Sequence, residues 1–172
     1  MSLFRTFAPL FVVLLLGACG FRSLYGTDAT RDAPGDLATI EVNPIANRLG
    51  HQLRNNLLDL LNPRGRPANP RYFLTVQLDQ STQRLAIEKD AFATRANLRL
   101  LANFSLHDPD SQEIVLSGKS LMVSSYNVLD SEFATLMAEK DAKARAVREI
   151  AHGVRTRLAA FFVRRGGGEE SR

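Results

Sequence analysis

The chain has 172 residues, which is enough for one domain of ordinary size. Its residues are 45% hydrophobic and 23% charged, a composition typical of globular proteins and not of disordered ones. The formal net charge of +4 is far from the excess that nucleic-acid-binding domains carry, although a mildly positive surface suits an anionic lipid.

Residues 1–18 have the layout of a secretory signal peptide. Arg5 gives a positive start, an apolar run extends from Phe7 to Leu16, and two small residues follow. The run is shorter than the roughly 20 apolar residues that a helix needs to span a bilayer. We therefore expect this segment to be removed on export.

The segment Leu16–Cys19 resembles the lipobox of bacterial lipoproteins, in which the cysteine is acylated and becomes the first residue. A thiolate is a strong nucleophile, and this lone cysteine has no disulfide partner. The alternative is that Cys19 is only a small residue near a cleavage site. If acylated, it would carry a diacylglycerol and an N-acyl chain such as palmitate, with no other cofactor. Gly20 follows where aspartate would favour the inner membrane, so the outer membrane is expected, with residues 19–36 as a lipidated tether.

The first predicted elements are a strand and a helix. Leu37–Val42 alternates apolar and polar residues, and Asn43-Pro44 favours a helix start with asparagine as the cap. Leucines at steps of three and four then mark one helix face, which Asn62-Pro63 should end. Residues 62–70 are predicted to form a loop.

Three strands are predicted next. Alternation begins at Tyr72 and is prolonged through Leu85 and Ile87, and a cleaner strand runs from Ala96 to Leu106. The turn residues 107–111 predict an antiparallel hairpin to a strand that begins near Ile114. In that strand the apolar parity changes after Gly118, which predicts a β-bulge there and inward-facing Leu121 and Val123.

A long helix is predicted to complete the domain, capped by Asp130 and ended by the Gly166–Gly168 run. Its apolar positions include Phe133, Leu136, Met137, Val147, Ile150, Val154, Leu158 and Phe162. These patterns predict an α+β fold, an antiparallel-rich sheet of about four strands with two helices packed on one face. The domain is expected to span 37–165, and 166–172 to be a disordered tail.

The sequence offers no catalytic motif. The three histidines, His51, His107 and His152, have no metal-ligand spacing, and no nucleophile elbow or phosphate-binding glycine loop is present. We therefore expect a binding protein and not an enzyme, with no metal site. A small periplasmic hydrolase is the competing hypothesis, which predicts loss of activity when these histidines are replaced.

Basic residues on the predicted strands are candidates for binding an anionic lipid head group. Lys89, Arg95, Arg99 and Lys119 are the candidates, because Arg and Lys match phosphate oxygens. The alternative is an ordinary solvated sheet face. Phe73, Tyr126 and the Ser124-Ser125 pair are expected on the exposed face or at strand ends, as in partner-binding surfaces.

After Cys19 the sequence continues Gly20-Phe21-Arg22-Ser23-Leu24-Tyr25-Gly26. This opening is similar to the mature N-terminus of the LPS-assembly lipoprotein family, LptE. The order of elements and the segment Ser125-Tyr126-Asn127 before an alanine-rich helix are also similar, so the resemblance spans nearly the whole mature chain. Only the opening motif is specific.

The resemblance implies an outer-membrane lipoprotein on the periplasmic side that plugs the lipopolysaccharide-export β-barrel LptD and assists its assembly. It also implies binding of lipopolysaccharide through basic residues and help in inserting it into the outer leaflet. An auxiliary lipoprotein of a periplasmic phospholipid or ABC lipid-transport system is the alternative. Neither function involves nucleic acid.

Overall fold

The computed structural model describes residues 33–85, 95–111 and 113–169. The predicted signal peptide, Cys19, most of the tether and Lys89 lie outside the described residues. The described residues belong to the unit Asp32–Arg172.

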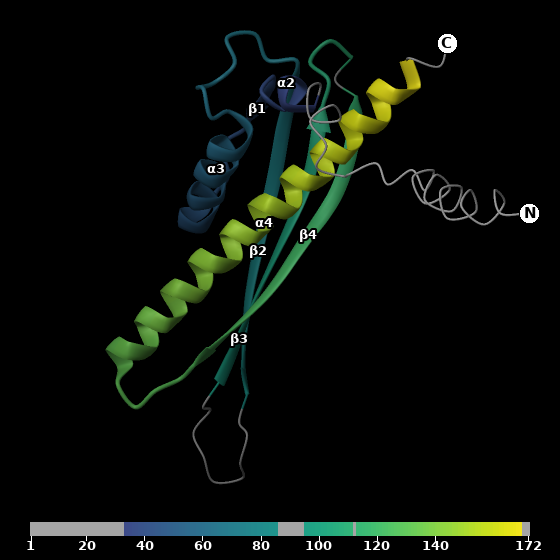
Figure 1. The fold of residues 1–172 in the computed structure, drawn as a ribbon. Coiled ribbons are helices and arrows are strands. Elements are labelled where there is room, and N and C mark those ends of the chain that lie inside the picture. Colours follow the sequence, from purple (N-terminus) through teal and green to yellow (C-terminus); the bar gives the residue numbers. More distant parts are fainter. Residues whose placement is uncertain (1–32, 86–94, 112, 170–172) are drawn as a thin grey trace, which may run out of the picture. The chain divides into compact units, whose positions relative to one another are not determined.

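Alternating side chains along the middle of the chain build a four-stranded sheet in the order β1-β2-β3-β4. The short β1 (Ile40–Val42) pairs parallel with β2 (Tyr72–Leu85). The long strands β2, β3 (Arg95–His107) and β4 (Ile114–Asn127) pair antiparallel as consecutive neighbours (Figure 1). This arrangement confirms the predicted α+β class and the hairpin between the last two strands.

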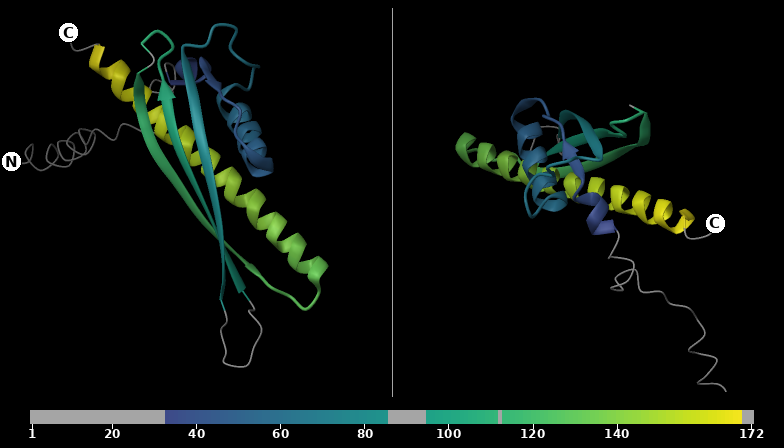
Figure 2. Two further views of the ribbon diagram at one scale, coloured as in Figure 1. Left: turned by 180° about the vertical axis from the view of Figure 1, so that it is seen from behind. Right: turned by 90° about the horizontal axis from the view of Figure 1, so that it is seen from above.

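The helices lie on one face of this sheet and bury its apolar side chains. The helix α3 (Asn47–Leu61) packs against β1, β2 and α4, whereas α4 (Glu132–Glu169) crosses β4 and β3 diagonally (Figures 1 and 2). The short α2 (Ala33–Leu37) precedes β1 and packs against α4. Alternate residues of β3, among them Leu98, Leu100 and Leu106, are fully buried beneath the helices, as the period of two predicts.

The start of α3 differs from the predicted one. Asn43 does not cap the helix, because its side-chain amide donates to the Thr75 hydroxyl oxygen on β2 at 3.0 Å. The helix begins at Asn47, whose φ of 72° is a left-handed conformation that asparagine tolerates better than most residues. Its predicted end is confirmed. Asn62 follows the last helical residue, and its side chain donates to the carbonyl oxygens of Ala38 and Ile40.

The predicted bulge at Gly118 is wrong. Gly118 lies opposite Phe104 in regular register, and a Cβ at this position would meet the Phe104 ring at 2.6 Å. The glycine therefore makes room for an aromatic ring. The strand does have an irregularity, but at Val115, since Leu106 pairs with Leu116 and His107 with Ile114. The parity after Gly118 is unchanged, and Leu121 and Val123 are 50% and 48% exposed.

The start of α4 also departs from its prediction. Ser131 caps the helix, because its hydroxyl oxygen accepts the Ala134 backbone N–H at 3.3 Å, and Asp130 does not. The first apolar positions are exposed, with Phe133 at 73% and Leu136 at 59%. Burial begins at Ala142. The cause is visible in Figure 1, where the first turns of α4 run past the part of the sheet that the helix covers.

Two element ends fall outside the predicted domain of 37–165. The helix α2 occupies the end of the expected tether, and α4 continues through Gly166 to Glu169, into the expected tail. An established helix gains a hydrogen bond with each added residue, so it can extend through glycines that would not nucleate one.

Candidate functional site

The sheet face opposite the helices, called here the outer face, is the candidate binding surface. It carries the side chains of alternate residues from β2, β3 and β4, which the register arranges in rows across the strands. Polar contacts connect neighbouring strands: the Ser125 hydroxyl donates to Asn97 Oδ1 at 2.7 Å, and Asn103 Nδ2 donates to Asp79 Oδ2 at 3.4 Å. These hydrogen bonds connect side chains of neighbouring strands across the outer face.

The structure places three of the four predicted basic residues on this face. Arg95 pairs with Asn127, Arg99 with Val123, and Lys119 with Asn103, and all three basic side chains are exposed. Arg95 and Arg99 are four positions apart on β3, and Arg99 is four positions from Asn103, the partner of Lys119, which corresponds to about 13 Å in each case. The three charges therefore share one face without meeting at one point. Lys89 lies outside the described residues.

Apolar side chains fill the space between these charges. Leu101 pairs directly with Leu121 in the row between Arg99 and Lys119, and Val123 lies beside Arg99. Leu121 and Val123 reach this face because β4 has no bulge at Gly118. This part of the surface was not predicted from the sequence, because a bulge at Gly118 would turn both residues toward the core. Their even spacing from Lys119 along one strand was the signal that could have located them.

Two residues expected on the exposed face point to the core instead. Ser124 and Tyr126 are 8% and 9% exposed, because they share the inward parity of Ser120 and Met122. Burial raises the pKa of the Tyr126 hydroxyl, and the Glu139 carboxylate raises it further, against the smaller effects of Lys143 and Arg84. Phe73 is half-buried on the outer face, and Ser125 is exposed there, as expected.

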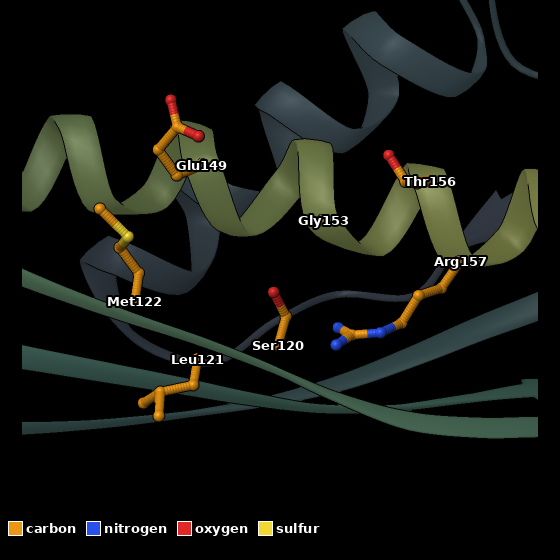
Figure 3. A pocket seen from close by; sticks show the side chains of 7 residues that line it. All are labelled: Ser120, Leu121, Met122, Glu149, Gly153, Thr156 and Arg157. Atoms are coloured by element: carbon orange, nitrogen blue, oxygen red, sulfur yellow. The ribbon is translucent and has the colours of Figure 1, made fainter. Parts of the chain in front are cut away.

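A groove lies between β4 and α4, with a volume of about 410 Å³. Ser120, Leu121 and Met122 line it from the strand, and Glu149, Gly153, Thr156 and Arg157 from the helix. The helix approaches the strand closely at Gly153, where a Cβ would meet Ser120 Oγ at 2.7 Å. In Figure 3 the Arg157 guanidinium extends toward Ser120, while the Glu149 carboxylate points away from the strand.

The histidines do not form a common site. His51 and His152 are exposed on α3 and α4, and His107 lies at the end of β3. His107 Nε2 is 2.9 Å from the Ser105 hydroxyl oxygen two residues earlier on the same strand. In the part of the chain that the structure describes, no three His, Cys, Asp or Glu side chains cluster as metal ligands would. Nor does any helix in that part have the length and apolar character needed to cross a membrane.

A family model for LptE, lipopolysaccharide assembly, matches residues 37–158. The chain belongs to the LptE family. The match begins at the end of α2 and ends within α4, so it covers all four strands, α3 and most of α4. As an LptE family member the protein is a lipoprotein with a role in lipopolysaccharide assembly. Members of the family are assembly factors and not enzymes, and they typically reside at the outer membrane.

Two relatives are similar to this chain over most of its length. An uncharacterized protein of Rickettsia prowazekii (strain Madrid E) is 28% identical over 159 residues, which is 91% of this chain and 98% of the relative. A crystal structure of a lipoprotein from Caulobacter crescentus CB15 is 25% identical with a TM-score of 0.61, covering 75% of this chain and 93% of that one.

The rare lipoprotein B of Shewanella oneidensis has the same fold. Its TM-score is 0.55 at 11% identity, and the match covers 70% of this LptE family chain and 93% of that one. The shared fold at so low an identity indicates that the sheet and helix arrangement is the common feature of these lipoproteins.

Proposed function

We propose that this LptE family member is an outer-membrane lipoprotein that plugs the lipopolysaccharide-export barrel LptD and assists its assembly. The family match, which covers the whole sheet, α3 and α4 as far as Leu158, is the observation that carries the proposal. A barrel lumen is polar and water-filled. The outer face, with charged and hydrogen-bonding side chains over a rigid sheet, has the chemistry of a domain that fills such a lumen.

The same face supports contact with lipopolysaccharide during its insertion into the outer leaflet. Arg95, Arg99 and Lys119 offer cations for phosphate groups, and Leu101 and Leu121 offer apolar area between them. To bind an amphiphile with several phosphates, a surface needs cationic and apolar side chains next to one another. Lys89 completes the proposed set of basic residues.

The exposed start of α4 supports the existence of a protein partner. Leu129, Phe133, Leu136 and Met137 are all at least 44% exposed around the capped first turn. The Thr135 hydroxyl holds this turn in place, since it donates to the Leu129 carbonyl oxygen at 3.1 Å and accepts the Leu129 N–H at 2.8 Å. An exposed apolar patch that is held in a fixed conformation is typical of an interaction site.

Acylation of Cys19 would hold the protein on the periplasmic side of the outer membrane. Each buried methylene contributes about 0.8 kcal/mol, and stable anchoring takes more than one chain. Residues 1–18 would be removed, and 19–36 would connect the lipid to the domain. The anchor would also raise the effective concentration of the domain near the barrel.

The decisive experiment is affinity purification from gently solubilised native membranes. We expect one large outer-membrane protein at equal stoichiometry, identified by mass spectrometry as LptD, and an N-terminus at an acylated Cys19. An ABC transporter complex in its place would favour the phospholipid-transport function. Recovery of free monomer with an unmodified thiol would refute the proposal.

A further inference from the structure

The outermost strand of the sheet, β4, exposes an edge suited to strand addition. Among the described residues no strand pairs with β4 on the side away from β3. Natural edge strands are protected by charges, prolines or bulges. In β4 the one charged residue, Lys119, and the irregularity at Val115 both precede the segment Ser120–Asn127, which has neither charge nor proline.

The opposite edge of the sheet is different. Beyond its pairing with β1, which ends at Leu74, β2 continues to Leu85 through residues that include Asp79, Arg84 and three glutamines. Charged and strongly polar side chains disfavour the addition of another strand. The unprotected edge is therefore that of β4.

The groove beside this edge supplies a charge. Arg157 reaches into it toward Ser120, and Glu149 points away (Figure 3). The ion pairs among the described residues join Glu139 to Lys143 and Asp141 to Arg145. Neither includes Arg157, so no carboxylate of the described residues lies within ion-pair distance of its guanidinium. A strand added to β4 would place alternate side chains on the helix side of the sheet, next to this groove.

We propose that the edge Ser120–Asn127 receives an extended segment of the barrel partner, one of whose acidic side chains binds Arg157. This inference rests on the proposed function for the identity of the partner. Charge complementarity argues against a second copy of this chain as the occupant. The same edge of another copy has no acidic residue between Ser120 and Asn127 to reach Arg157.

Site-specific cross-linking of the full-length protein, co-expressed with its barrel partner, tests the contact. A photo-cross-linking amino acid replaces Leu121 on the β4 edge or, as the control, Gln83 on the free edge of β2. We expect Leu121 to cross-link to one extended barrel peptide that contains Asp or Glu, and Gln83 not to cross-link to that peptide. Cross-links from Leu121 to a second copy of this chain, or to no barrel peptide while the barrel co-purifies, would overturn the proposal.

Charge reversal tests the role of Arg157. Arg157→Glu should reduce the recovered complex by about tenfold or more, as losing one partner of a desolvated charge pair does. Arg155→Glu, an exposed α4 change that does not line the groove, should leave it unchanged. Replacing the cross-linked acidic residue of the barrel by Arg should restore binding to Arg157→Glu.

An unaltered complex with Arg157→Glu would refute the ion pair and with it the inference, while the proposed function would stand. If the wild-type chain recovers no barrel at all, the proposed function fails, and the inference fails with it.

Discussion

The aromatic ring of Phe104, opposite Gly118 on β3, leaves no space for a side chain at position 118. A methyl group here would lie 2.6 Å from Phe104 Cζ, and Phe104 is only 4% exposed, so the ring has little room to move. We expect Gly118→Ala to lower the free energy of unfolding by about 1–3 kcal/mol, the usual cost of overpacking a core.

Denaturant titration measures the effect. Phe104→Leu removes the ring atoms that clash, so the double variant should recover part of the loss caused by Gly118→Ala in the Phe104→Leu background. Gly166→Ala is the control, because nothing lies within 4 Å of a Cβ there. Equal effects of the two glycine substitutions would contradict the packing argument.

The Tyr126 hydroxyl links stability to alkaline pH. Its pKa in the folded chain is raised, chiefly by burial and then by Glu139, whereas in the unfolded chain it ionises near its ordinary value of about 10. Above that pH the unfolded state loses a proton that the folded state keeps, so unfolding becomes more favourable. We expect the free energy of unfolding to fall as pH rises from about 10 toward the folded-state pKa.

The comparison with Tyr126→Phe isolates this effect. The phenylalanine variant should lack the part of the alkaline decrease that this hydroxyl causes, and absorbance at the phenolate band should show delayed ionisation in the wild type. Parallel pH curves for the two proteins would show that Tyr126 ionises equally in both states.

At the scale of whole elements, α4 depends on a cap that the sequence did not single out. Ser131 and Asp130 are both good capping residues, and only the path of the chain after β4 decides which hydroxyl or carboxylate meets the Ala134 N–H. We expect Ser131→Ala to lower the free energy of unfolding by about 1 kcal/mol. Asp130→Ala should cost less than about 0.5 kcal/mol, through the helix dipole alone. A larger effect at Asp130 than at Ser131, in thermal or denaturant unfolding, would show that Asp130 caps the helix.

The long elements were predictable because helices and strands have different periods in the sequence, whereas the short helix α2, in the expected tether, was not predicted. The leucine face of α3, the end of that helix at Asn62-Pro63 and the alternation in β3 are local patterns, and the structure confirms them. The phase of β4 after Gly118 was predicted wrongly. Its inward positions Gly118 and Ser120 are small because the Phe104 ring and the close approach of α4 at Gly153 leave little space there, and the large apolar side chains of Leu121 and Val123 lie on the outer face.

The candidate site shows the same difference between local patterns, which the sequence reveals, and contacts between elements, which it does not. Arg95 and Arg99 share one open face, as the alternation of β3 predicts, and Lys119 of the neighbouring strand lies on the same face because β4 has no bulge at Gly118. The apolar row of Leu101 and Leu121 was not foreseen, since its recognition needs the register between β3 and β4. The same holds for the groove at Arg157, which joins residues far apart in the sequence.

At the scale of the whole folded domain, the open face should bind lipopolysaccharide in a salt-sensitive way. Replacing Arg95, Arg99 and Lys119 together by Ala removes three exposed cations from one surface, each worth up to about 1 kcal/mol against a phosphate. We expect the affinity for lipopolysaccharide to fall by roughly tenfold or more at low ionic strength, and the slope of affinity against salt to become shallower. The matched control replaces Arg148, Arg155 and Arg164, three exposed arginines of α4, and changes the net charge by the same amount. If both triple variants lose the same affinity, attraction to net charge alone would account for binding, whereas an unchanged affinity in the first variant would place the binding surface away from the outer face.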